Sequence, residues 1–327
     1  MITNLSSISN EEVNSVRDIV MNEKKHLEKD LDFRACDHLH SIAYQASSLA
    51  LTRQGTFENL KNLSAADLQK VAKQYYGSVN MTIGAAGNFQ AQSFISSLEK
   101  NFQVPKGEAA LNKPNIVFGS AVHERDDRTD DAHITIGYAG IARGSSDYYT
   151  LQAIRHMVGD YSKYNGGSNN HSQNLAELVA TEKVVDSYHT FNHSYADTGL
   201  FGVSLRTHGK NLDDAVCYTV SEFTRIANSS RPSEISRAKN ALRNEVLFER
   251  DGIDSLSKVL ARNAFYGTEI RSFSHIIDKI NQITPDSLRE LAQNHFMDAE
   301  PVIVGIGSTR KLPDYNQIRG WTHWWRM

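Results

Sequence analysis

The sequence repeats itself, and the repeat restricts the folds open to the chain. Residues 58–89 align without a gap on residues 278–309 at a constant offset of 220. Each segment carries an N-cap candidate, Ser64 or Thr284, ahead of an amphipathic helix and a short apolar strand. Ordered matches of cap, helix and strand are hard to obtain from shared composition, so we infer two copies of one unit of about 220 residues.

The alignment continues upstream at an offset of 222, after a two-residue insertion or deletion between Tyr44 and Leu60. Matched pairs include Val16 with Ala238, Val20 with Leu242, Glu23 with Glu245, Leu68 with Leu288, Tyr76 with Phe296, and Ile83 with Ile303. Residues 116–231 have no upstream counterpart, so the first copy begins only at its second half. A half domain leaves an uncovered sheet edge and an incomplete core. We therefore expect another chain to supply the missing half.

The pattern of elements predicts an α+β fold with two homologous domains. We place the C-terminal half of a first domain, consisting of helices plus a strand, at 1–103 and a polar linker at 104–114. A complete second domain, a mixed sheet with helices packed on it, follows at 115–309, with a tail at 310–327.

Individual elements follow from periodicity and turn residues. Strands are predicted at 81–86, 116–122, 133–139 and 302–306, with a hairpin over 184–205 that turns near 197–199. Helices are predicted at 148–158 and 175–182, followed by three helices between 213 and 296, and residues 164–170 are expected to form a loop.

Composition excludes several classes of protein. Hydrophobic residues make up 40% and charged residues 22%, which is typical of a folded chain. A net charge of −3 gives no support for a nucleic-acid-binding surface. Cys36 and Cys217 cannot form a disulfide framework or a C-x-x-C metal knuckle. No apolar stretch is long enough to span a bilayer, and residues 1–20 are too acidic for an import presequence.

Motifs for nucleophilic, nucleotide-binding or zinc chemistry are missing from the sequence, including H-x-x-E-H. The closest histidine cluster is the stretch DHLH at 37–40. On a helix, His38 and His40 point to different faces, so they do not form a pair of metal ligands. A structural or surface role is the simpler interpretation for both.

Glu23 is less ordinary, because it stands on the apolar stripe of the first helix. A carboxylate on a core-facing stripe needs a partner, since burying it unpaired is costly. That partner could be a lysine, an arginine, a metal ion or solvent in a cleft. A glutamate that is simply paired or at the boundary of the core is the alternative.

All three tryptophans lie in the last seven residues, at Trp321, Trp324 and Trp325. Such large apolar groups usually pack on a surface. The tail is expected to dock either on its own chain or on a partner.

Four stretches resemble a known family: RDIVMNE at 17–23, DHLHSIAYQ at 37–45, FNHSYADTGLFG at 191–202 and LPDYNQIR at 312–319. Together they are similar to motifs of the β-type mitochondrial processing peptidases and the core 1 subunits of respiratory complex III. These proteins belong to the pitrilysin-type zinc peptidases. The resemblance covers essentially the whole chain and implies two homologous domains, in agreement with the repeat.

The resemblance also implies roles for individual residues. Glu23 stands at the family's downstream zinc-ligand position, whereas the H-x-x-E-H motif belongs to the missing half domain. We therefore expect no catalysis by this chain alone, no cofactor in it, and zinc only if a partner supplies the histidines. Asp37 stands at a substrate-binding position. Phe33 replaces a second carboxylate there, with Arg34 beside it, which weakens the case for binding a cationic presequence.

These expectations favour a structural core 1-type subunit of complex III, as one part of a split subunit. It would be peripheral to the mitochondrial inner membrane on the matrix side. Its partners would be the chain carrying the missing half, a core 2 or α-type processing peptidase homologue, and other subunits of a dimeric complex. One alternative is a zinc endopeptidase completed by a separate H-x-x-E-H chain. Another is a soluble interaction module.

Overall fold

The computed structural model describes residues 7–45, 47–102, 104–108, 115–165, 172–267 and 272–323. The chain divides into two compact units, each described here by itself. The first unit comprises residues 1–29, 52–113 and 249–270, and the second comprises residues 30–51, 114–248 and 271–327.

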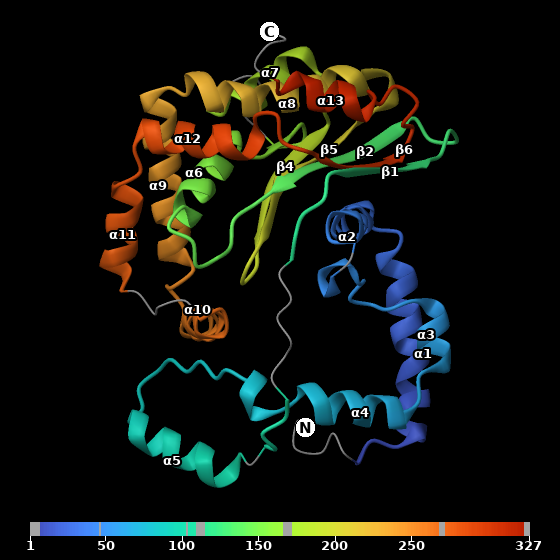
Figure 1. Ribbon diagram of the computed structural model, residues 1–327, viewed down its shortest axis with the longest axis vertical. Coiled ribbons are helices and arrows are strands. Elements are labelled where there is room, and N and C mark those ends of the chain that lie inside the picture. The colour runs from blue at the N-terminus through green and yellow to red at the C-terminus, as the bar shows by residue number, and fades with distance from the viewer. Residues whose placement is uncertain are drawn as a thin grey trace. The chain divides into compact units, whose positions relative to one another are not determined.

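The second unit is built on a mixed sheet with strand order β1-β6-β2-β5-β4-β3 (Figure 1). The strands are β1 (Ser120–Arg125), β2 (Asp131–Ala139), β3 (Tyr161–Ser162), β4 (Ser187–Ser194), β5 (Gly199–His208) and β6 (Val302–Gly307). Strand β6 lies parallel to β1 and antiparallel to β2, so Val304 pairs with both Val122 and Thr135. The mixed α+β architecture predicted from the sequence is confirmed.

Helices cover both faces of this sheet. The second unit contains α2 (Leu31–Ala43), α6 (Tyr148–Val158), α7 (Asn174–Glu182), α8 (Leu212–Ser229), α9 (Pro232–Phe248), α11 (Phe273–Asn281), α12 (Pro285–Phe296) and α13 (Tyr315–Trp321), with 3₁₀ turns at Ser48–Ala50 and Gly209–Asn211. Helices α6, α8 and α12 pack on one face, where alternation along β2 places Ile134, Ile136 and Tyr138 in the main core (Figure 1).

Helix α2 packs on the opposite face of the same sheet (Figure 1). Leu39 and Val304 share an apolar cluster there. An ion pair and a hydrogen bond join the helix to the strands: Arg34 pairs with Glu124, and His38 Nε2 donates to Glu124 Oε1 at 2.7 Å. The two sides of the sheet therefore have separate apolar cores.

The first unit is a set of helices without a sheet among its described residues. It contains α1 (Asn10–Leu27), α3 (Phe57–Asn62), α4 (Ala65–Tyr75), α5 (Ala91–Asn101) and α10 (Ile253–Phe265), with a 3₁₀ turn at Ser78–Asn80. Arg17 of α1 donates to the carbonyl of Leu63 at 2.6 Å. Its repeat mate Lys239 of α9 donates to the carbonyl of Ile283, the mate of Leu63, at 2.8 Å. The repeat is thus preserved at the level of single hydrogen bonds.

The two repeats exchange one helix. Helices α2 and α10 occupy equivalent positions at an offset of 222, and both are 13 residues long. Helix α2 belongs to the first repeat but to the second unit, whereas α10 belongs to the second repeat but to the first unit. The two compact units therefore do not coincide with the segments 1–103 and 115–309 that were predicted from the repeat. Those domain boundaries remain a prediction.

Gly84 shows how closely α10 packs in the first unit. A Cβ atom at Gly84 would lie 2.4 Å from the carbonyl oxygen of Ser257 and 2.6 Å from the amide nitrogen of Ala261, so only glycine permits this approach. In the second repeat Val304 replaces Gly84 and packs in one cluster with Leu39, the mate of Ala261. Each exchanged helix thus contacts the equivalent segment of the other repeat.

Several sequence predictions agree closely with the structure. Helix α6 spans the predicted 148–158, α7 begins one residue early, and the hairpin of β4 and β5 turns at 195–198. Both predicted N-caps form capping boxes, Ser64 with Asp67 and Thr284 with Ser287.

Other predictions were wrong. The described residues between 212 and 296 form five helices, not three, because short turns at 249–252 and 282–284 divide the predicted segments. Residues 116–119 precede β1 rather than belonging to it. Residues 81–86 form no strand, since a strand needs hydrogen-bonded neighbours and the described part of this unit offers none. Residues 104–108 of the linker are irregular, whereas 109–114 and 166–170 fall outside the described residues.

Trp321 packs against the main core of its own chain. At this residue the tail docks on its own chain, one of the two predicted possibilities. Trp324 and Trp325 lie outside the described residues. Among the described helices, none is long and apolar enough to cross a membrane.

Candidate functional site

Glu23 lies on α1 in the first unit, and its side chain is exposed. The stripe on which it stands is itself mostly open, since Val13 is buried, Val20 is half-buried and Val16 is exposed. The carboxylate is therefore solvated rather than buried without a partner. What the sequence suggested as a core-facing stripe is a core face that the described chain does not cover.

The equivalent residue of the second repeat, Glu245, has two hydrogen-bond donors as partners, His156 and Arg155. His156 Nε2 donates to Glu245 Oε2 at 2.7 Å, and Arg155 Nη2 donates to the same oxygen at 2.6 Å. The hydrogen bond from His156, assisted by the charge of Arg155, lowers the pKa of the Glu245 carboxyl against the effect of burial. Both partners come from α6, which has no counterpart among the described residues of the first unit.

The donors present do not make a zinc site. Zinc in proteins takes three or four nitrogen, sulfur or oxygen ligands. Within the described residues, no group of three or more His, Cys, Asp and Glu side chains could hold a metal ion. Glu23 is a single carboxylate donor, so this part of the chain does not fit zinc without further ligands. The assignment of Glu23 to a ligand position remains a prediction.

Asp37 lies on α2 in the second unit and is half-buried. Glu23 belongs to the first unit, so each carboxylate is described within its own unit. The basic neighbour of Asp37 on this helix, Arg34, is engaged by Glu124. The substrate-binding role predicted for Asp37 is therefore untested.

The two histidines of the DHLH stretch have different partners. His38 donates to Glu124. Its pKa is lowered mainly by burial and further by the charge of Arg34. His40 contacts the hydroxyl of Tyr195 through Nε2 at 2.6 Å. This separation agrees with the structural roles predicted for both residues.

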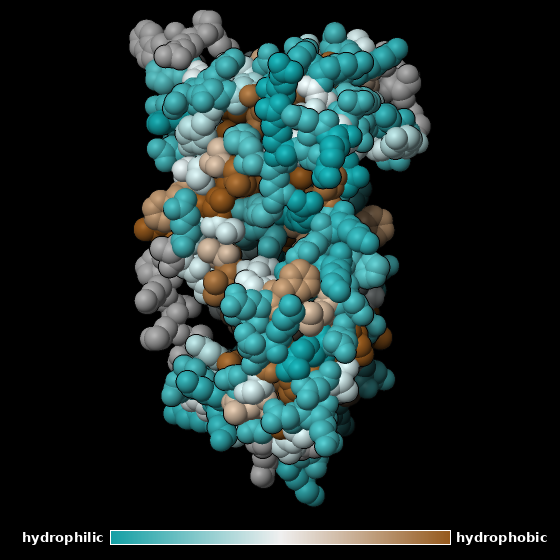
Figure 2. Space-filling model, turned by 90° about the vertical axis from the view of Figure 1, so that its right-hand side faces the viewer, coloured by the Kyte–Doolittle hydropathy of each residue, from teal (hydrophilic) through white to brown (hydrophobic). Residues whose placement is uncertain are grey.

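The most informative feature of the first unit is a set of open core positions: Val16, Val71, Tyr76 and Ile83. All four are exposed, whereas their repeat mates Ala238, Leu291, Phe296 and Ile303 are buried in the main core of the second unit. Tyr76 is 51% exposed and Phe296 is 0% exposed. Apolar residues reach the surface at several places among hydrophilic side chains in Figure 2.

The packing of Phe296 shows what the open core positions lack. Its ring centroid lies 5.6 Å from that of Tyr138, 5.3 Å from that of Phe201 and 4.9 Å from that of Phe223. These rings come from β2, β5 and α8, all within residues 116–231. That is the half of the repeat with no counterpart ahead of Tyr76. The half domain inferred from the sequence is therefore the part that would cover these positions.

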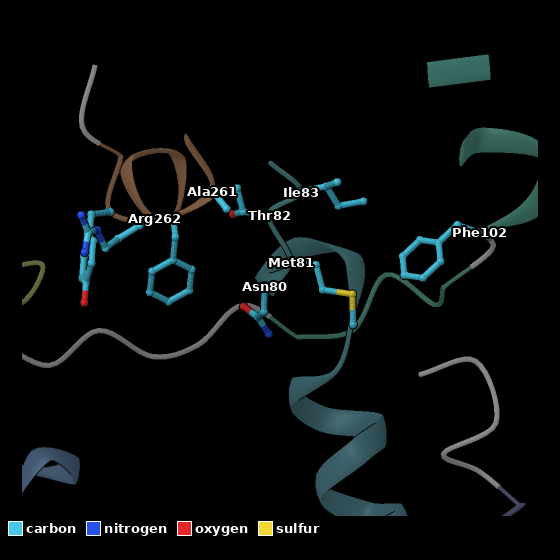
Figure 3. Close-up of a pocket in the computed structure, with 9 residues that line it drawn as sticks. Asn80, Met81, Thr82, Ile83, Phe102, Ala261 and Arg262 are labelled. Carbon is cyan, nitrogen blue, oxygen red and sulfur yellow. The ribbon is translucent and has the colours of Figure 1, made fainter. Parts of the chain in front are cut away.

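A pocket of about 500 Å³ opens in the first unit between residues 80–83, Phe102 and the C-terminal part of α10 (Figure 3). We call it the α10 pocket. From α10 and its C-cap residue it is lined by Ala261, Arg262, Phe265 and Tyr266. Figure 3 shows the α10 residues on one side and Phe102 on the other, with Met81 between them.

Sequence analysis missed the pocket and the partners of Glu245. Phe265 could have been noticed, because its repeat mate is the small Ala43. The adjacent residues Arg155 and His156 at the end of a predicted helix were a weaker signal, because nothing in the sequence indicates that they contact Glu245.

Comparisons with known proteins agree with the fold. Residues 62–242 match the family described as Peptidase M16 inactive domain. The chain is 30% identical to cytochrome b-c1 complex subunit 1 of Mus musculus, over 98% of this chain and 68% of that protein. It is also 30% identical to the β subunit of the mitochondrial processing peptidase of Dictyostelium discoideum, over 95% of this chain and 68% of that protein.

Among solved structures, a chain of Complex III2 from Candida albicans with Inz-5 bound superposes with a TM-score of 0.90. It is 24% identical in sequence, and the match covers 98% of this chain and 78% of that one. This similarity shows a shared fold. The chain spans about two thirds of the length of the two sequence relatives.

Proposed function

Because the chain belongs to the M16 peptidase family, in which complex III subunit 1 and the β-type processing peptidase are its relatives, we propose that it is a structural core 1-type subunit of mitochondrial ubiquinol–cytochrome c reductase. It acts as one part of a split subunit, and a separate chain supplies the missing half domain. The proposal makes the chain a scaffold rather than a catalyst.

The observation that carries this proposal is the contrast between the open core positions and their buried repeat mates. Ile83 is 52% exposed and Ile303 is 1% exposed, although they follow the equivalent helices α4 and α12 and stand in equivalent apolar segments. Residues suited to a core are usually covered when the protein works, and a large exposed apolar patch marks an interface. A chain with this surface is best explained as part of an assembly.

Two features favour a scaffold over a peptidase. A peptidase site would bring Glu23 together with further zinc ligands, and the described residues contain no group of three or more side chains that could hold a metal ion. A cationic presequence would need carboxylates near Asp37, where Phe33 and the Glu124-bound Arg34 stand instead. The proposed location is the matrix side of the mitochondrial inner membrane, peripheral to the bilayer. The proposed partners are a core 2-type homologue and other subunits of a dimeric complex III.

A second candidate is a zinc endopeptidase completed by a partner chain with H-x-x-E-H. The exposed carboxylate of Glu23 favours this candidate. Its repeat mate Glu245 is bound by Arg155 and His156 of α6, a helix in the half of the repeat that has no counterpart in the first copy. A partner helix could place either cationic side chains or zinc-binding histidines beside Glu23. Zinc would then be a property of the assembly and not of this chain.

Affinity purification of the native chain from mitochondria, with mass spectrometry of every co-purifying chain, tests the proposal. The scaffold predicts complex III subunits together with a chain whose sequence matches the missing half. Intact H-x-x-E-H in that chain, with zinc in stoichiometric amount, would support the peptidase instead. Purification of the chain without complex III subunits would contradict the proposed function.

A further inference from the structure

We propose that the α10 pocket receives the tip of a β-hairpin from the chain that completes the first unit. The tip places an aromatic side chain against Phe265 and Tyr266 and offers a hydrogen-bond acceptor to Arg262. This inference rests on the proposed function, and it adds the element that docks, the residues that receive it and the chemistry they select.

The second unit provides the template for this docking. There the turn between β4 and β5 covers the end of α2, and the ring of Tyr195 lies edge-on to that of Tyr44 at 6.2 Å between centroids. Phe191 and Leu200, from the two strands of the hairpin, share one apolar cluster with Ala43 and Tyr44. The end of α2 is thus closed by aromatic and aliphatic side chains of a hairpin.

Among the described residues, the α10 pocket is the equivalent surface without a covering hairpin. At the offset of 222, Phe265 is the mate of Ala43 and Tyr266 is the mate of Tyr44. Ala43 and Tyr44 are fully buried beneath the hairpin, whereas Phe265 is 63% exposed. Because β4 and β5 lie in the half without a first-repeat counterpart, a hairpin from a completing half domain would close this surface.

Arg262 determines what the tip must carry. Its mate His40 donates from Nδ1 to the carbonyl of Cys36 at 2.7 Å, so in the neutral form of the ring Nε2 accepts from the Tyr195 hydroxyl. An arginine has only donors, so a tip that binds Arg262 must supply the acceptor instead. Arg262 Nη2 donates to Glu249 at 3.0 Å, and its enclosed Nε has no acceptor among the described residues. The tip therefore presents a hydroxyl, carbonyl or carboxylate oxygen.

Photo-crosslinking locates the occupant. Replacing Phe265 with the photoreactive residue p-benzoylphenylalanine should give a crosslink, in the purified assembly, to the hairpin tip of the half-domain chain, at the position that aligns with Tyr195. Ile253, at the other end of α10, is 65% exposed and is the matched control position. Crosslinking from position 265 to another element of the assembly, or to no protein, would overturn the inference, and a bound small molecule would then be the occupant to seek.

A charge placed in the pocket gives a second test. Phe265→Asp should reduce recovery of the half-domain chain by at least about tenfold, whereas Ile253→Asp should not, because a buried aromatic anchor dominates such contacts. Circular dichroism should show both variants folded, since both side chains are exposed in the free chain. If the half-domain chain co-purifies equally with wild type and Phe265→Asp, the inference fails and the proposed function stands. If it is missing from the wild-type assembly, both fail.

Discussion

Tyr76 and Phe296 occupy the same position in two repeats, yet one ring is 51% exposed and the other is 0% exposed. Phe296 is enclosed by the rings of Tyr138, Phe201 and Phe223, which the preceding half of its own repeat supplies. Nothing equivalent precedes Tyr76 in this chain. The same segment therefore acts as a core in the second unit and as a surface in the first.

Truncating Ile83 and Ile303 should have unequal effects on the isolated chain. Ile303→Ala should lower the free energy of unfolding by about 2–5 kcal/mol, because it opens a cavity in a filled core. Ile83→Ala should lower it by less than about 1 kcal/mol, because the side chain is already exposed. Urea unfolding followed by circular dichroism measures both. Equal losses would mean that residues 81–86 are covered in the isolated chain after all.

Arg17 should stabilise the first unit through the carbonyl groups it binds. It donates to Leu60 at 3.0 Å and to Leu63 at 2.6 Å. Arg17→Ala should cost about 1.5 kcal/mol of unfolding free energy, the usual scale for hydrogen bonds from a charged group. Arg17→Lys should recover most of this loss, because Lys239 performs the same task in the other repeat. An unchanged midpoint in Arg17→Ala would show that these hydrogen bonds add nothing.

Glu245 should make the second unit sensitive to acid. Its pKa is lowered in the folded state, chiefly by the hydrogen bond from His156, so its contribution is present above the ordinary value of 4.5 and is lost as pH falls through the lower folded pKa. Glu245→Gln should remove this acid-dependent loss and cost about 1 kcal/mol near neutral pH, since the pair is partly solvated. Unfolding free energies measured from pH 7 to pH 3 test this. Identical pH profiles for the two proteins would contradict the assignment.

His133 should act in a higher pH range. Burial, partly offset by Asp32, lowers its pKa from 6.5 to about 4, and Nε2 hydrogen-bonds Ser204 at 2.9 Å. The unfolded chain takes up this proton first as pH falls, so the second unit should lose stability between about pH 6.5 and pH 4. His133→Gln should lower stability at neutral pH and flatten the profile in this window. Unfolding free energies measured from pH 7 to pH 4 test this, and identical pH profiles for the two proteins would contradict the assignment.

The repeat was readable from sequence because its helices keep the same apolar spacing and caps. The matches of Leu68 with Leu288 and of Ser64 with Thr284 report local structure, which sequence encodes directly. The exchange of α2 and α10 could not be read in the same way. An amphipathic stripe shows that a helix face is buried, but it does not say which sheet buries it.

The site was harder to predict for a similar reason. Glu23 was recognised by its place on a stripe and by resemblance, and its assignment to a ligand position remains a prediction, since the side chain is exposed. The strand expected at 81–86 has the right residues but no hydrogen-bonded neighbour in the described part of its unit, so local preference alone does not form it. Arg262 and Phe265 become informative only when the structure shows that they line a pocket and that their mates His40 and Ala43 are covered by a hairpin.

Amide hydrogen exchange across residues 82–87 tests the central claim most directly. These residues correspond to β6, which is hydrogen-bonded on both sides by β1 and β2. If a partner half domain completes the first unit, these amides should exchange at least about 100-fold more slowly in the purified assembly than in the isolated chain. Equally fast exchange in the two samples would show that no strand pairs with this segment and would contradict the account.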